Sequence, residues 1–216
     1  MSQTHTVLYK GGQGEVEEKK SKFISHVFPI ETEESVSEIL SSLKKQYWDA
    51  RHHCYAFSLG DHNEILRSSD DGEPSGTAGK PILDVITSQE IHNCLIVVIR
   101  YFGGTLLGTG GLVRCYRQAA LDGLNHSVCV EKLDGALYTI TTDYTDIGKL
   151  QYYLGEHQIP VLDSNYTDTV TLQIPLSVQE ADAQLTQLTE LTSGRIQVEK
   201  QEEISFGFLN HSFLLL

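Results

Sequence analysis

The chain has 216 residues, of which 40% are hydrophobic and 21% charged; these fractions are typical of a globular protein and exclude extensive disorder. The formal net charge is −13, which argues against non-specific binding to DNA, because such binding depends on cations that neutralise phosphates. The four cysteines form no CxxC pair. That spacing indicates neither a disulfide scaffold nor a structural zinc site.

The charge is unevenly distributed along the chain. Residues 136–216 carry 3 Lys and Arg against 11 Asp and Glu, a balance of −8, whereas residues 1–135 carry −5. Any contact with RNA therefore needs a local basic patch in the N-terminal half. Residues 1–14 contain no apolar signal-peptide core, and the longest apolar run, Cys94–Ile99, is too short to cross a bilayer. We therefore expect a cytoplasmic protein that does not bind membranes.

In chain order, the N-terminal part predicts alternating strands and helices. A strand over Lys22–Ile30 precedes a helix that Thr32 can cap and whose core face carries Val36, Ile39, Leu40 and Leu43. The elements expected next are a hairpin of Cys54–Leu59 with Glu64–Arg67, a short helix over Ile82–Ile86, a buried strand over Cys94–Tyr101 and a helix from Thr109 or Gly110 to about Asn125.

A polar stretch with a turn residue, Glu131–Gly135, predicts a boundary between two domains, 1–132 and 136–216. Beyond it the pattern gives a strand over Ala136–Thr142, a helix over Asp146–His157, strands near Ile159–Tyr166 and Thr169–Leu176, a helix capped by Ser177, and a strand over Arg195–Phe208. The order βαββαβ is that of a ferredoxin-like unit, so the fold class is α+β.

Two glycine-rich segments, 69–81 and 100–114, stand between a strand and a helix. Backbone amides in such loops can bind an anion such as phosphate, helped by the following helix N-terminus. Glycine-rich turns also serve tight packing alone. The candidate binding residues are His53, Asp70, Asp71, Gly72, Glu73, Gly76, Thr77, Lys80, Arg100, Gly103, Gly104, Gly108, Gly110, Gly111, Arg114 and Arg117.

Known catalytic and nucleotide-binding signatures fail when tested on these segments. A P-loop needs Ser or Thr after Gly79-Lys80, where Pro81 stands. His52 and His53 precede an acidic group, but neighbouring strand residues point to opposite faces, so both cannot easily serve one site. No complete catalytic set can be assembled, and we expect no catalytic residue, no bound metal and no cofactor.

The segments Ala50-Arg-His-His-Cys-Tyr-Ala-Phe57, Ser69–Pro81 and Arg100–Arg114 resemble the YigZ/IMPACT family. The family pattern is HxCYA, then SDDGEPSGTAGxPIL, then RYFGGxxLGxGGLVRxY. These motifs are long and specific, and the C-terminal part resembles the bacterial YigZ branch.

The resemblance implies an N-terminal domain like the second domain of ribosomal small-subunit protein five and the fourth domain of elongation factor G. The C-terminal domain would then be similar to that factor's fifth domain. Eukaryotic IMPACT regulates translation through a separate RWD domain for which this chain has no room, so its role in the kinase pathway does not carry over. Nothing in the motifs supports a peptidase.

Two functions follow from the residues and the resemblance together. One is a non-enzymatic, translation-associated module that docks on ribosomal RNA or a ribosome-associated protein. The other is an enzyme acting on a small phosphorylated ligand bound by the glycine-rich loops. Fold likeness cannot separate them, and the lack of a catalytic set favours the first.

Overall fold

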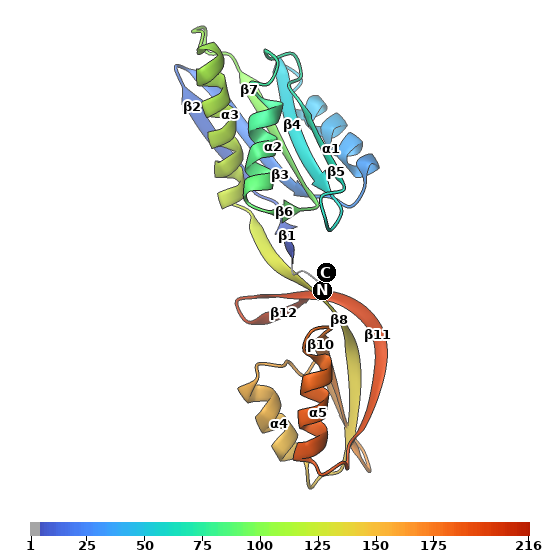
Figure 1. The fold of residues 1–216 in the computed structure, drawn as a ribbon. Helices are drawn as coiled ribbons and strands as arrows, with labels where there is room; N and C mark the ends of the chain where they lie inside the picture. Colours follow the sequence, from blue (N-terminus) through green and yellow to red (C-terminus); the bar gives the residue numbers. More distant parts are fainter. Residues whose placement is uncertain (1–4) are drawn as a thin grey trace. The chain divides into compact units, whose positions relative to one another are not determined.

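A computed structural model describes residues 5–216, which divide into two compact units. The N-terminal unit comprises His5–Val130, and the described part of the C-terminal unit comprises Glu131–Leu216. Figure 1 shows the elements of each unit. Both units combine β-sheet with helices, which confirms the α+β fold class.

The N-terminal unit is built on a five-stranded antiparallel sheet with the order β2-β3-β7-β4-β5. Its central strand, β7, is buried on both faces from Cys94 to Arg100. Such a run of apolar residues is what a strand covered on both sides requires. The strands are β2 (Gln13–Glu18), β3 (Ser21–Pro29), β4 (His52–Leu59), β5 (Ile65–Ser69) and β7 (Cys94–Tyr101).

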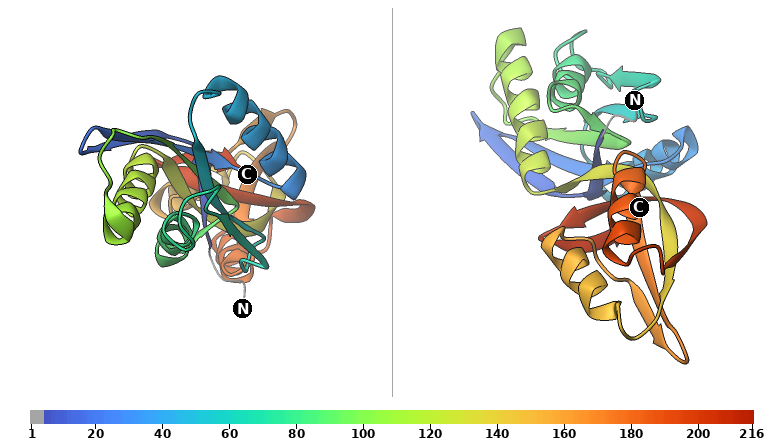
Figure 2. Two further views of the ribbon diagram at one scale, coloured as in Figure 1. Left: turned by 90° about the horizontal axis from the view of Figure 1, so that it is seen from above. Right: turned by 60° about the horizontal axis from the view of Figure 1, so that its bottom comes forward.

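Three helices cover the two faces of this sheet (Figure 2). Helix α1 (Glu33–Gln46) packs on one face, over a core that includes Leu95, Val97 and Ile99. Helices α2 (Gly79–Ser88) and α3 (Gly108–Asn125) pack side by side on the other face. The predicted cap of α1 is confirmed, since Thr32 Oγ1 accepts a hydrogen bond from the Ser35 amide at 3.2 Å.

Two short strands complete the N-terminal unit. β1 (His5–Lys10) pairs in parallel with β6 (Ile91–His92). Neither these strands nor β2 is expected from the sequence, because β2 (QGEVEE) carries a single apolar side chain and gives almost no alternating signal.

The C-terminal unit has the order β8, α4, β9, β10, α5, β11, which confirms the ferredoxin-like βαββαβ arrangement. Its antiparallel sheet runs β12-β11-β8-β10-β9 and adds β12 as a terminal hairpin strand. The bounds are β8 (Val128–Thr142), α4 (Ile147–Glu156), β9 (Asp163–Tyr166), β10 (Val170–Ser177), α5 (Ala181–Leu191), β11 (Gln197–Leu209) and β12 (Ser212–Leu215).

Two local predictions in this part of the chain are wrong. The stretch Glu131–Gly135 is not a turn, because β8 continues through it from Val128 to Thr142. Gly135 is held within β8, opposite Ser177 of β10 and Ile204 of β11. Ser177 does not cap α5 either: it ends β10, its hydroxyl donates to the Glu180 carboxylate, and the helix starts at Ala181.

Candidate functional site

The antiparallel register brings the two glycine-rich segments to one end of the N-terminal sheet. β4 begins beside the end of β7, where His52 lies opposite Arg100, and β5 ends beside the start of β4. Residues 70–78, which lead into α2, and residues 102–107, which lead into α3, therefore leave the sheet at the same end. The two segments enter neighbouring helices on the same face, and we refer to this region as the loop end.

The first segment is organised by Asp70. One carboxylate oxygen accepts hydrogen bonds from the amides of Ala78 (3.0 Å) and Gly79 (2.8 Å), and the other accepts from Gly76 (2.8 Å). Burial acts to raise the pKa of Asp70, but the three amide donors outweigh it and hold the pKa below its usual value. The position at the start of α2 where an external anion was expected is thus filled by the protein's own carboxylate.

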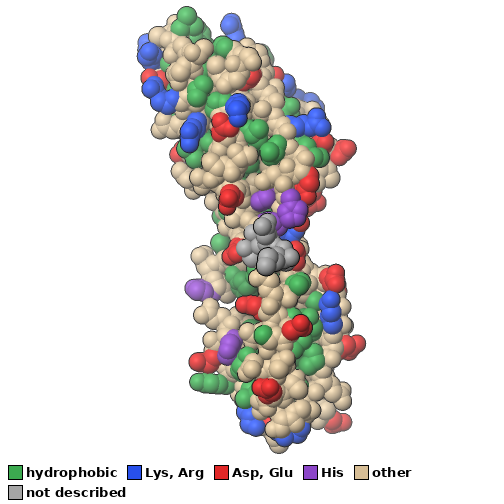
Figure 3. All heavy atoms as spheres, viewed as in Figure 1, with side chains coloured by type: hydrophobic (Ala, Val, Ile, Leu, Met, Phe, Trp, Pro, Cys, Tyr) green, Lys and Arg blue, Asp and Glu red, His purple; other side chains and the backbone are tan. Residues whose placement is uncertain are grey.

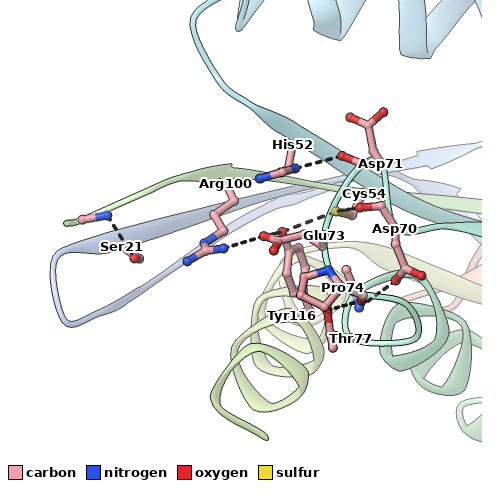
Figure 4. A network of polar contacts seen from close by, with 12 residues as sticks. Ser21, His52, Cys54, Asp70, Asp71, Glu73, Pro74, Thr77, Arg100 and Tyr116 are labelled. Carbon is pink, nitrogen blue, oxygen red and sulfur yellow. Dashed lines mark hydrogen bonds and ion pairs between the residues drawn. The ribbon is translucent and has the colours of Figure 1, made fainter. Parts of the chain in front are cut away.

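A buried ion pair lies beneath the same segment (Figure 4). Glu73 Oε1 lies 2.6 Å from Arg100 Nη1 and accepts a hydrogen bond from the Tyr116 hydroxyl at 2.8 Å. Glu73 and Arg100 are 9% and 7% exposed. These contacts join the loop, β7 and α3. The Arg100 guanidinium also lies over the Phe102 ring, 5.6 Å from the ring centroid. The positive charge of Arg100 is therefore engaged by groups of the protein itself.

Cys54, on β4, extends this network without being a nucleophile. Its Sγ lies 2.9 Å from the Asp70 carbonyl oxygen and 3.3 Å from the Tyr116 hydroxyl oxygen, and its single S–H can donate to either. Burial raises the pKa of Cys54 to about 12. Because the thiolate is the reactive form, this cysteine stays an inert neutral thiol near pH 7.

Asp71 connects the loop to the start of β4. Its Oδ2 accepts from the His53 amide at 2.7 Å, and its carbonyl accepts from His52 Nδ1 at 2.8 Å. Lys44 on α1 lies 3.4 Å from its Oδ1. The His53 ring points toward α1, away from Glu73, as alternation along β4 requires. Burial lowers the pKa of His53, a shift that the nearby Asp71 charge opposes. Asp71 and His53 therefore hold the loop in place.

The second segment approaches the β2–β3 turn closely. The Gly103 amide donates to Ser21 Oγ at 3.0 Å, and a Cβ atom on Gly103 would lie only 2.1 Å from the Lys20 carbonyl carbon. Gly104 and Gly108 adopt φ angles of 84° and 71°, which L-residues rarely adopt. Glycine is thus required here for close packing and for backbone conformation.

The start of α3 differs from the start of α2. Its N-cap residue, Leu107, makes no side-chain capping bond, and Gly108, Thr109 and Gly110 are exposed, with Gly111 half-buried behind them. A Cβ on Gly108 or Gly110 would meet nothing within 4 Å. The start of this helix is therefore exposed, and no side chain caps its first turn.

The predicted cations do not form one cluster. Lys80 is exposed and pairs with Asp84 at 2.9 Å, one turn along α2. Arg100 is buried with Glu73. Arg114 and Arg117 are both exposed on α3, and Arg114 lies 3.6 Å from Glu18. Of these four cations, Arg100 is buried, whereas Lys80, Arg114 and Arg117 are exposed.

Two further cations were missed by the sequence reasoning. Lys19 and Lys20 form the exposed turn between β2 and β3, next to Glu18, the residue that pairs with Arg114. Their φ angles are 48° and 65°, a conformation that a two-residue hairpin normally assigns to Asn or Gly. The two adjacent lysines before a predicted strand were the available signal for a hairpin turn. They indicate a turn only when the preceding strand, β2, is recognised as well.

The remaining predicted residues are structural within the loop. The Thr77 hydroxyl donates to the Pro74 carbonyl at 2.6 Å, and Gly72 and Gly76 adopt φ angles of 87° and 75°. Over residues 5–216, no group of three or more His, Cys, Asp or Glu side chains is placed to hold a metal ion. In the same range, no helix is both long and apolar enough to span a bilayer.

The two units correspond to two known domain families. Residues 19–124 match the Impact N-terminal domain, and residues 140–195 match a domain of unknown function, DUF1949. The chain is 36% identical to the IMPACT family member YvyE of Bacillus subtilis (strain 168) over 202 residues, which cover 94% of this chain and 93% of that protein. It is 34% identical to the IMPACT family member YigZ of Escherichia coli (strain K12), covering 86% and 92%.

Among solved structures, one described as "Crystal structure of an hypothetical protein" superimposes with a TM-score of 0.60 at 30% identity. The match covers 94% of this chain and 99% of that one. The chain thus belongs to the IMPACT family, and its bacterial relatives, YigZ among them, share nearly their full length with it. The family resemblance expected from the sequence motifs is confirmed.

Proposed function

We propose that this protein is a non-enzymatic, translation-associated module that docks on ribosomal RNA through the loop end of its N-terminal unit. The observation that carries the proposal is a set of exposed cations on adjacent elements: Lys19 and Lys20 at the β2–β3 turn, with Arg114 and Arg117 on α3. We call these four residues the basic end. In Figure 3, Lys and Arg side chains gather over α3 and the neighbouring strand.

The net charge of −13 does not prevent such docking. The C-terminal unit holds most of the excess, with a balance of −8 over residues 136–216. Charges farther away than about 10 Å are largely screened at roughly 0.1 M salt. Binding should therefore depend on the basic end and should weaken steeply as salt rises.

The alternative, an enzyme acting on a small phosphorylated ligand, has less support. It needs an anion position and a reactive group. At α2 the anion position is filled by Asp70, and near it Glu73 and Arg100 neutralise each other. Cys54 is an inert neutral thiol. The start of α3 is exposed and has no side-chain cap, and a helix N-terminus suits an RNA phosphate as well as a small ligand.

The test is co-sedimentation with purified ribosomes at several salt concentrations. Arg114→Glu with Arg117→Glu should reduce binding sharply and should make the salt dependence of log K shallower by about 2, or about 1 for each lost phosphate contact. The control is Lys10→Glu with Lys200→Glu, which makes the same change in net charge at two exposed lysines that are not part of the basic end, one in β1 and one in the C-terminal unit. Equal binding by the two folded double variants would exclude the basic end as the docking surface.

A further inference from the structure

The only tryptophan of the chain, Trp48, is almost fully exposed. It lies two residues after the end of α1, and its side chain is 81% exposed. Burying a tryptophan contributes strongly to stability, so a protein that leaves one in water gains nothing from it in folding. Large aromatic side chains left exposed in this way are typical of surfaces that bind a partner.

The backbone on both sides of Trp48 is fixed. The Tyr47 amide donates to the Leu43 carbonyl at 2.8 Å, and the Ala50 amide donates to the Tyr47 carbonyl at 3.0 Å. The Asp49 carboxylate accepts a hydrogen bond from the Tyr101 hydroxyl at 2.8 Å, which ties this turn to the end of β7. The backbone that carries the indole is therefore already ordered, and only the side-chain torsions of Trp48 lose freedom when a base stacks on the ring.

Cations surround this tryptophan along the chain. Lys44 and Lys45 lie in the last turn of α1, four and three residues before it, and Arg51 lies three residues after it; all three are exposed. The neighbouring Asp49 carboxylate accepts from the Tyr101 hydroxyl, and the Asp71 carboxylate lies 3.4 Å from Lys44. Residues 44–51 hold three cations and one carboxylate, so the chain around the ring carries a balance of +2, in contrast to the chain as a whole.

A second exposed aromatic ring belongs to the same end of the sheet. Phe102 is 49% exposed and follows Tyr101, the residue that holds Asp49. The buried Arg100 guanidinium lies 5.6 Å from its centroid, which fixes the ring from the inside. The loop end thus carries two aromatic rings that are open to solvent, Trp48 on an ordered turn and Phe102 in contact with Arg100.

We infer that Trp48 and Phe102 stack on unpaired bases of single-stranded RNA, while Lys44, Lys45 and Arg51 contact its phosphates. Aromatic rings among cations are the usual means of binding single strands, because every base offers a stacking face. In a duplex the bases stack on each other and their faces are not accessible. This inference rests on the proposed docking function and specifies the kind of RNA bound.

Trp48 itself provides the measurement, because it is the only tryptophan. Titration with an oligouridylate of about twelve nucleotides should quench its fluorescence, and an RNA duplex of equal length should leave the fluorescence unchanged. By anisotropy of a labelled oligouridylate, Trp48→Ala should bind about tenfold more weakly, as expected for one lost base stack. Trp48→Phe should restore most of the binding. The control, Tyr152→Ala, removes a side chain that is 71% exposed in the C-terminal unit and should have no effect.

The outcomes separate this inference from the proposed function. Ribosome binding that depends on Arg114 and Arg117, with no quenching by oligouridylate, overturns the inference and leaves the docking proposal standing. Quenching by oligouridylate with no ribosome binding supports the inference and overturns the ribosomal partner. Loss of ribosome binding in Trp48→Ala, with no oligouridylate binding by the wild type, identifies Trp48 as a contact for a protein and overturns the inference.

Discussion

Glu73 and Arg100 are 27 residues apart in the chain, yet their Oε1 and Nη1 atoms lie 2.6 Å apart in the interior of the N-terminal unit. Glu73 belongs to the loop before α2, and Arg100 belongs to the central strand β7. Tyr116 on α3 donates to the same carboxylate oxygen at 2.8 Å. One carboxylate thus joins a loop, a strand and a helix at the end where we propose that RNA docks.

Breaking this ion pair should destabilise the N-terminal unit severely. Glu73→Ala leaves the Arg100 guanidinium buried without its carboxylate partner, which should lower the free energy of unfolding by about 3–5 kcal/mol in urea denaturation. Glu73→Leu combined with Arg100→Met removes both charges and should recover much of that loss.

The matched control for this prediction is an exposed ion pair. Lys80→Ala breaks the pair with Asp84, whose side chains are 70% and 52% exposed, and should cost about 0–1 kcal/mol. A similar loss of stability for Glu73→Ala and Lys80→Ala would show that the buried pair contributes no more than a surface pair.

Asp70 should make the stability of the protein depend on pH in the acid range. Its folded pKa is held below the usual value of 3.8 by the amides of Gly76, Gly79 and Ala78, against the effect of burial. A group whose pKa is lower in the folded state stabilises the fold above its unfolded pKa. That contribution is lost as the pH falls from about 4 through the folded pKa.

Asp70→Asn is the variant that tests this pH dependence. The amide side chain keeps one oxygen acceptor, so the variant should be about 0.5–2 kcal/mol less stable than the wild type at pH 7. The difference should shrink as the pH is lowered below 4, when measured by urea denaturation at each pH. A difference that stays constant from pH 7 to the acid limit of folding would contradict the assigned role.

Two glycines of the second segment should respond in opposite ways to alanine. The Cβ of Gly103→Ala would overlap the Lys20 backbone, at 2.1 Å from its carbonyl carbon, and should cost about 1–3 kcal/mol of stability. Gly110→Ala meets nothing within 4 Å inside α3 and should leave stability unchanged or raise it by up to about 1 kcal/mol. Thermal unfolding of both variants measures the contrast, and equal melting temperatures would refute the packing role of Gly103.

Local sequence patterns were sufficient for most of the elements. The alternation and the 3.6-residue period identified α1, β7 and the βαββαβ order, because both patterns depend on neighbours within a few residues. They did not detect β2, whose outward-facing residues are nearly all polar. They also predicted a turn at Glu131–Gly135, because glycine is common in turns. Gly135 is instead a strand residue fixed by pairing with Ser177 and Ile204, which are distant in the chain.

The sequence by itself determined the family, the α+β class and the location of two unusual loops between strands and helices. Only the tertiary structure decided what the charges in those loops do. Asp70 occupies the start of α2, Arg100 is neutralised by Glu73, and Arg114 and Arg117 are exposed beside two cations that the motifs did not indicate, Lys19 and Lys20. The physical reason is that a charged side chain is paired or unpaired depending on which groups lie beside it in the folded protein. Those groups can be far away in the sequence, and local patterns do not show which of them folding brings together.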